Sequence, residues 1–164
     1  MNNIKQHSIL FIYCSFFIAL FLQTISWPLY LQLFCPSWIN LVLAYWTLVI
    51  PKTINIGTGF FLGLLIDLIL GSTLGIHSLA LSVFSYLVIS SSQSSQYEPI
   101  YQQILIMSLL SLIIKLIVVI LDMLTNNILF RVEVLWGSLV DGLLWPYLSF
   151  TIKNLEILLI KKNN

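Results

Sequence analysis

The sequence consists mostly of long apolar stretches with very few charged residues, and this scarcity of charge limits what the chain can fold into. Only 8% of its 164 residues are charged, and 59% are hydrophobic. Soluble domains carry about 25% charged residues. A water-soluble fold of this length could not cover its surface with so few charges. The sequence therefore predicts an all-α integral membrane protein.

A helix that crosses a bilayer needs about 20 mostly apolar residues, and fewer where the bilayer is thin. The sequence holds six candidates, within a single transmembrane domain that covers residues 1–164. We expect these helices at about residues 8–26, 37–50, 54–70, 76–91, 102–130 and 134–152. The second candidate is short, so the alternative is a five-span arrangement in which it does not cross. We prefer six spans.

Prolines, glycines and polar residues separate the predicted helices. Trp27-Pro28 ends the first helix, and the apolar arm from Leu29 to Pro36 is too short to span, so we expect it along the membrane interface. The turn from Gly71 to Gly75 is short enough to make the third and fourth helices a hairpin. The stretch from Ser90 to Tyr101 is polar and is predicted as the one real loop.

Basic residues in the short connections predict the orientation, because cytoplasmic loops of membrane proteins are enriched in them. With six spans, both termini lie on one side of the membrane. That side carries five basic residues, and the other side carries only Arg131. The five are Lys5, Lys52, Lys153, Lys161 and Lys162. We therefore expect both termini in the cytoplasm.

The third predicted helix carries the most specific pattern in the chain. Every fourth position is glycine or aspartate, namely Gly59, Gly63, Asp67, Gly71 and Gly75. Residues four apart share one helix face, so the pattern predicts a narrow groove that contains a carboxyl group. Small residues let membrane helices approach closely. The stripe is therefore either an ordinary packing face or a docking face for a partner helix.

Four ionisable residues lie within the apolar stretches: Asp67, Lys115, Asp122 and Asp141. A charge near the centre of a bilayer costs about 2.5–3.5 kcal/mol on insertion scales, so each should face protein or water and find a partner, or lose its charge. The helical rise puts Lys115 at a depth similar to that of Asp67 and Asp141, with Asp122 nearer the outer surface. We expect Lys115 to be the counter-ion of Asp141 or of Asp67. The alternative is that its long side chain reaches an interface.

Patterns for catalysis and cofactor binding are absent from the sequence. His7 and His77 stand alone, and Cys14 and Cys35 offer neither a metal site nor a disulfide framework. No phosphate-binding loop or nucleophile elbow occurs. A net charge of +1 gives no reason to expect nucleic acid as a partner. The sequence predicts no enzyme, no cofactor and no metal.

Several short motifs, taken in order, resemble the MreD family of rod shape-determining proteins in its gammaproteobacterial form. They are Trp27-Pro28, Pro36-Ser37-Trp38, the run from Leu41 to Trp46, the run from Asn55 to Phe60, Gly63, the run from Asp67 to Gly75, Phe130-Arg131-x-Glu133-Val134 and Gly142-Leu143-Leu144-Trp145-Pro146. Length and span pattern agree as well, so the resemblance covers nearly the whole chain.

The resemblance implies a function that composition alone does not. MreD-like proteins lie in the bacterial inner membrane and work with MreC, the filament protein MreB, and RodA with its penicillin-binding transpeptidase partner. They maintain rod shape and have no known reaction of their own. Their fold resembles the substrate-binding membrane subunits of energy-coupling-factor transporters, with six helices around a central pocket. The stripe from Gly59 to Gly75 would then be a partner-helix face or part of a pocket wall.

Two functions stand as expectations. The first is a non-enzymatic scaffold that binds MreC and holds the peptidoglycan synthases for wall elongation. The alternative is a small-molecule or lipid-binding transport subunit, in which Asp67, Lys115 and Asp141 would line a cavity at the midplane. Co-purification with MreC favours the first, and co-purification with an ATPase module or a bound ligand favours the second.

Overall fold

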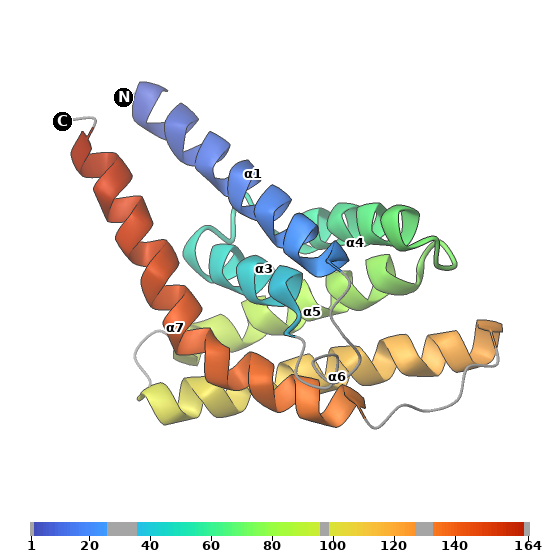
Figure 1. The fold of residues 1–164 in the computed structure, drawn as a ribbon. Coiled ribbons are helices and arrows are strands. Elements are labelled where there is room, and N and C mark those ends of the chain that lie inside the picture. The colour runs from blue at the N-terminus through green and yellow to red at the C-terminus, as the bar shows by residue number, and fades with distance from the viewer. Residues whose placement is uncertain (1, 26–35, 96–98, 127–132, 163–164) are drawn as a thin grey trace.

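The computed structural model describes residues 2–25, 36–95, 99–126 and 133–162. Within these ranges the regular structure is helical, without a strand, as the composition predicts. The described helices are α1 (Asn2–Thr24), α3 (Trp38–Val49), α4 (Ile56–Leu70), α5 (Ile76–Ser95), α6 (Ile100–Asn126) and α7 (Glu133–Lys162). They form a bundle in which the start of α1 and the end of α7 lie on the same side of the view (Figure 1).

The short helix α3 lies in the middle of the bundle and is buried over most of its length. Nine of its 12 residues are buried, and it packs on α1, α5 and α7. A helix that is apolar on all sides is stable inside a fold, where other helices surround it. The indole Nε1 of Trp46 donates a hydrogen bond to Ser15 Oγ at 2.8 Å and fastens α3 to α1.

The helices α4 and α5 form a hairpin, because local signals start and stop α4. Asn55 caps its N-terminus: the Asn55 side chain accepts from the N–H of Gly57, and the Asn55 N–H donates to Thr58 Oγ1, both at 3.0 Å. At the other end Gly71 has φ of +65° and Gly75 has φ of +111°. Positive φ angles favour glycine, so these two residues make the tight turn.

The helices α6 and α7 run against each other along the lower part of Figure 1. Gly142 allows a close approach, since a Cβ there would lie 2.7 Å from Ser108 Cβ and 2.8 Å from the carbonyl oxygen of Ile104. Pro146 lies inside α7 and removes a backbone hydrogen bond from it. Such a residue bends a helix, and α7 changes direction along its length (Figure 1).

The polar stretch from Ser90 to Tyr101 is not the loop that its composition predicts. The helix α5 continues to Ser95 and α6 begins at Ile100, so both ends of the stretch are helical. Extending a helix that an apolar run has already nucleated costs little, even with serine and glutamine. The same reasoning applies to the first helix, which begins at Asn2.

Some expectations fall on residues outside the described ranges. They are the end of the first helix at Trp27-Pro28, the interfacial arm from Leu29 up to Cys35, and Phe130 and Arg131. The side chains of Lys5, His7, Glu133, Lys161 and Lys162 are outside the described set as well.

Among the described helices, α6 is long and apolar enough to cross a membrane, over Ile100–Thr125. Shorter apolar helices of 10–17 residues are Leu10–Thr24, Trp38–Val49, Ile56–Leu70 and Ile76–Ser91. Large apolar side chains such as Phe17 on α1 and Phe61 on α4 are exposed on the outside of the bundle. Extended apolar surface of this kind is typical of a protein that meets lipid or other proteins. The number of spans stays a prediction.

Candidate functional site

The carboxylate of Asp141, on α7, is fully buried and joins three parts of the chain. Its Oδ2 lies 2.8 Å from Lys115 Nζ on α6. The same oxygen accepts a hydrogen bond from the hydroxyl of Ser111, one turn earlier on α6. Its Oδ1 accepts from the backbone N–H of Ser37 at 2.7 Å. Donors from two other segments therefore occupy both oxygens.

The contact with Ser37 places the Asp141 carboxylate at the N-terminus of α3. Ser37 is the N-cap residue of this helix, but its own side chain makes no capping hydrogen bond, and the first turn has no acidic residue. The first N–H groups of a helix lack partners and carry partial positive charge. Asp141 thus provides, from a distant segment, the cap that α3 lacks locally.

The carboxylate of Asp67 lies one turn before the end of α4 and is also buried. Its Oδ1 accepts from Ser72 Oγ at 2.8 Å and from the N–H of His77 at 3.2 Å. The same oxygen lies 2.7 Å from His77 Nδ1. Its Oδ2 accepts from the N–H of Gly75 at 2.9 Å. Asp67 therefore caps the N-terminus of α5 and closes the hairpin.

The depth of Lys115 in the predicted helices leaves two possible counter-ions, Asp141 and Asp67. In the structure Lys115 contacts Asp141, and Asp67 pairs with His77. Asp67 as the counter-ion of Lys115 is wrong, because the donors of its own hairpin surround that carboxylate. The alternative that Lys115 reaches an interface is wrong too, since its side chain is only 17% exposed and its ammonium group meets a buried carboxylate. Asp122 is partly exposed and lies two turns further along α6 than Lys115.

Sequence reasoning missed four members of these sites: Ser72, His77, Ser111 and the backbone of Ser37. A local signal existed for three of them. Ser111 precedes Lys115 by one turn and so shares its helix face, and Ser72 and His77 lie in and just after the turn that follows Asp67. The Ser37 contact spans 104 residues of sequence, and no local pattern reports it.

The glycine face of α4 packs against α5 of the same chain. A Cβ on Gly63 would overlap the backbone of Ser78. A Cβ on Gly59 would overlap Ser85 Oγ and lie 2.7 Å from the carbonyl oxygen of Leu81. The stripe is thus a packing face, as small residues in membrane helices often are. A docking face for another protein at these glycines is wrong, because α5 occupies it.

The stripe also ends earlier than its spacing suggests. Since α4 ends at Leu70, Gly71 and Gly75 belong to the turn and not to the helix face. A Cβ at either position would meet nothing within 4 Å, so these glycines are required for their positive φ and not for close packing. Asp67 is a helix cap and not the lining of a groove.

A cavity of about 180 Å³ lies between the two carboxylate sites. Its polar lining residues are Gln23, Ser37, Asn40, His77 and Lys115. Neither Asp67 nor Asp141 lines it, because each carboxylate points to its own donors. Of the three residues expected to line one cavity, Asp67, Lys115 and Asp141, only Lys115 lines this one.

This arrangement positions helices and neutralises buried charge. The residues that the structure describes contain no group of three or more histidine, cysteine or acidic side chains that could hold a metal ion. The described cysteine, Cys14, is a free and exposed thiol. The cavity has room for several water molecules, and the buried Gln23 Oε1, which has no hydrogen-bond partner among the described residues, borders it.

The chain is similar to known rod shape-determining proteins along most of its length. The family model for rod shape-determining protein MreD matches residues 4–154. The curated rod shape-determining protein MreD of Haemophilus influenzae is 36% identical over 141 residues, which are 86% of this chain and 87% of that protein. No solved structure matches the chain significantly, so the expected likeness to energy-coupling-factor subunits stays a prediction.

Proposed function

The chain belongs to the MreD family of rod shape-determining proteins, and from that premise we propose that it is a non-enzymatic membrane scaffold of the bacterial wall-elongation complex. In this role it binds MreC and holds the wall-synthesis machinery, namely RodA with its transpeptidase partner and, indirectly, MreB. Family membership itself gives a membrane protein with a role in determining rod shape.

One observation carries the proposal: the buried carboxylates hold helices together, and neither lines the cavity of about 180 Å³ that lies between them. Asp67 fastens α4 to α5, and Asp141 fastens α7 to α6 and to the start of α3. A buried charge is tolerated when it is paired and hydrogen-bonded, and both carboxylates meet that condition within the fold. A fixed interior with an apolar exterior suits a subunit that holds other proteins in the membrane.

We place the helices across the inner membrane with both termini in the cytoplasm. The start of α1 and the end of α7 lie on the same side of Figure 1, as an even number of spans requires. The exposed Lys52, after α3, and Lys153, on α7, then lie on the cytoplasmic side, in keeping with the distribution of basic residues in membrane proteins. The two carboxylate sites lie towards the other side.

Partner binding has to use outward-facing side chains, because α5 covers the glycine face of α4. Large residues that are more than half exposed include Phe17 on α1, Phe61 on α4, Leu109 on α6 and Tyr147 on α7. In a membrane such faces meet lipid or another helix. We propose that MreC covers at least one of them.

The transport alternative has less support. It requires ionisable groups that face a cavity, and of the three expected there only Lys115 lines the cavity of about 180 Å³. A stoichiometric transport substrate, such as a vitamin or a lipid precursor, or an ATPase module that co-purifies with the protein would favour transport over the scaffold.

Depletion of the protein in its host tests the role in cell shape, and site-specific crosslinking in the same cells tests the partner. Depleted cells should become round, and wild-type protein should restore rods. A photo-activatable amino acid then replaces Phe17, Phe61, Leu109 or Tyr147 in turn. We expect an MreC adduct at one or more of these positions and none at Phe84, which is fully buried and serves as the control.

The depletion test and the crosslinking test can be contradicted independently of each other. Cells that keep their rod shape on depletion would contradict the role in wall elongation. Cells that become round, with no adduct at any of the four outward positions, would leave that role intact and contradict MreC binding through these faces.

A further inference from the structure

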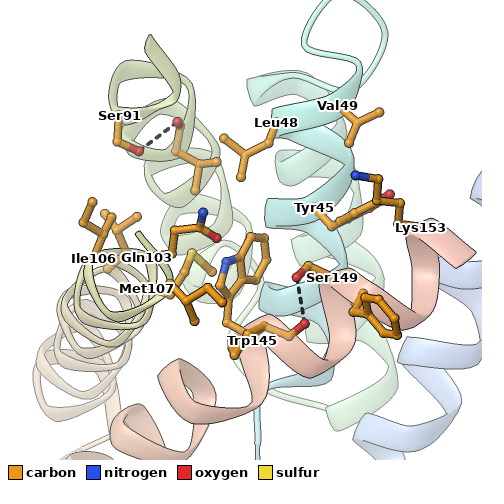
Figure 2. A pocket seen from close by; sticks show the side chains of 15 residues that line it. Tyr45, Leu48, Val49, Ser91, Gln103, Ile106, Met107, Trp145, Ser149 and Lys153 are labelled. Atoms are coloured by element: carbon orange, nitrogen blue, oxygen red, sulfur yellow. Dashed lines mark hydrogen bonds between the residues drawn. The ribbon is translucent and has the colours of Figure 1, made fainter. Parts of the chain in front are cut away.

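A second cavity, of about 380 Å³, lies between α3, α5, α6 and α7. Figure 2 shows side chains from these four helices converging on it. It includes Val49, the last residue of α3, and Ile100, the first of α6, whereas Asp141 caps the opposite end of α3. We propose that this cavity binds an anionic phospholipid, with an acyl chain between the helices and the phosphate at Lys153.

The inner wall of the cavity is apolar and buried. Val88 of α5, Met107 of α6 and Trp145 of α7 line it and are at most 5% exposed. Water is a poor occupant of such a wall, because a buried water needs two to four polar partners. The volume lies within the range of about 300–1,000 Å³ that small-ligand sites have. A lipid chain is the apolar molecule that a membrane protein meets most often.

The mouth of the cavity is polar and carries a positive charge. Lys153 lines it, is exposed, and forms no ion pair with another described residue. The acidic residue one turn further along α7, Glu156, accepts a hydrogen bond from the hydroxyl of Tyr45 at 3.4 Å. Ser91 and Ser149 add hydroxyl groups to the lining. Basic pockets between membrane helices on the cytoplasmic side bind anionic headgroups.

The membrane placement proposed above puts this mouth in the cytoplasmic leaflet, where anionic lipids concentrate. Lipid binding goes beyond the scaffold role and rests only on that placement. Because binding is measured on the isolated protein, its failure would be distinct from a failure of the role in cell shape.

Native mass spectrometry of the full-length protein tests the headgroup contact. The probes are dioleoyl phosphatidylglycerol, which is anionic, and dioleoyl phosphatidylcholine, which is zwitterionic. Wild-type protein should retain phosphatidylglycerol in preference. Lys153→Gln should lower the affinity for phosphatidylglycerol about fivefold, the effect of one lysine near a lipid surface. The matched control, Lys52→Gln, changes an exposed lysine outside the cavity and should leave both affinities unchanged.

Filling the cavity tests the acyl-chain contact. The hydroxyl of Ser149 donates to the carbonyl of Pro146 in its own helix, so Ser149→Leu fills the cavity without breaking a bond between helices. It should reduce retention of both lipids severalfold. Ser82→Leu is the matched control, because Ser82 also donates to a carbonyl three residues earlier but does not line the cavity. Ser91→Leu fills the cavity from α5 and replaces Ser149→Leu if that variant does not fold.

Three results would overturn the proposal. The first is equal retention of the two lipids by wild-type protein, or retention of neither. The second is the same affinity for phosphatidylglycerol in Lys153→Gln and Lys52→Gln. The third is undiminished lipid retention in a cavity-filling variant whose melting temperature matches that of the wild type. In that case a side chain of a partner protein, and not a lipid chain, would be the better candidate for the cavity.

Discussion

Asp67 and Asp141 are both buried carboxylates that cap the N-terminus of a helix, yet they reach their partners in opposite ways. Every partner of Asp67 lies within ten residues of it, in the hairpin turn. The hydrogen-bond donors to Asp141 lie 30 and 104 residues away. One site closes a hairpin that the local sequence already favours. The other joins segments that only the complete fold brings together.

The basic partners sharpen the contrast. Lys115 brings an ammonium group into the interior, so removing the Asp141 carboxylate leaves an unpaired buried charge. The imidazole of His77 can donate from Nδ1–H to a carboxylate while neutral, so removing the Asp67 carboxylate leaves neutral donors. We therefore expect the distant site to tolerate substitution less than the local one.

The largest effect should come from Asp141→Asn. It leaves Lys115 without its counter-ion, and breaking one member of a buried ion pair costs about 3–5 kcal/mol. Adding Lys115→Met should restore most of the free energy of unfolding, because no charge then remains and the amide oxygen of the introduced asparagine still accepts from the Ser37 N–H. Denaturant unfolding in micelles measures both. A double variant less stable than Asp141→Asn alone would contradict the claim that the unpaired charge of Lys115 makes the Asp141 site the more sensitive of the two.

Exchanging the charges, with Lys115→Asp and Asp141→Lys together, should not restore stability in the same assay. A lysine at position 141 cannot accept the hydrogen bonds from Ser37 and Ser111. A fully stable exchanged variant would mean that the ion pair matters and the cap on α3 does not.

Gly63→Ala should give the next largest loss of free energy of unfolding, about 2–3 kcal/mol. The added Cβ would overlap the Ser78 backbone and force α5 away from α4. Gly71→Ala is the matched control. It meets no atom within 4 Å and loses only the preference for positive φ, which costs about 1 kcal/mol. Equal losses of stability would show that the hairpin depends on its turn and not on its packed face.

Asp67→Asn should lower the free energy of unfolding by about 1–2 kcal/mol. The new amide has an NH2 group in place of one carboxylate oxygen, so the backbone or side-chain donors that face that position lose their acceptor. The substitution is the same as at Asp141, so the two results compare the sites directly by the same unfolding assay. A loss at Asp67 as large as that at Asp141 would remove the distinction between local and distant sites.

His77→Gln should give the smallest loss of free energy of unfolding, about 0.5–1 kcal/mol. The backbone N–H groups of residue 77 and of Gly75 still donate to Asp67 after this change. Thermal unfolding of the purified variant measures it. A loss of about 3 kcal/mol or more, the scale of a broken buried ion pair, would show that the local site depends on a charged pair as the distant one does.

The features of the fold that the sequence predicts are those set by local patterns. Apolar runs locate the helices, and the glycines at 71 and 75 locate the hairpin turn. Depth along the helices places Lys115 level with Asp141. The start of α1 and the end of α5 escape prediction, because extending a helix with polar residues costs too little to leave a signal.

The parts of the site that escape prediction depend on which surfaces meet. Small residues pack a membrane helix against its own chain or against another protein by the same physics, so the stripe at Gly59 and Gly63 does not reveal its partner. The contact between Asp141 and Ser37 joins two segments that share no pattern. For the same reason the sequence identifies Asp67 as an unusual residue but not as a helix cap.

The most direct test of the account is cell shape in depleted host cells that express the uncharged double variant Lys115→Met with Asp141→Asn. If these charges serve the fold alone, the variant should accumulate in the membrane at the level of wild-type protein and restore rods. Round cells with wild-type amounts of folded variant in the membrane would contradict the account, because the buried pair would then have a role beyond holding the helices together.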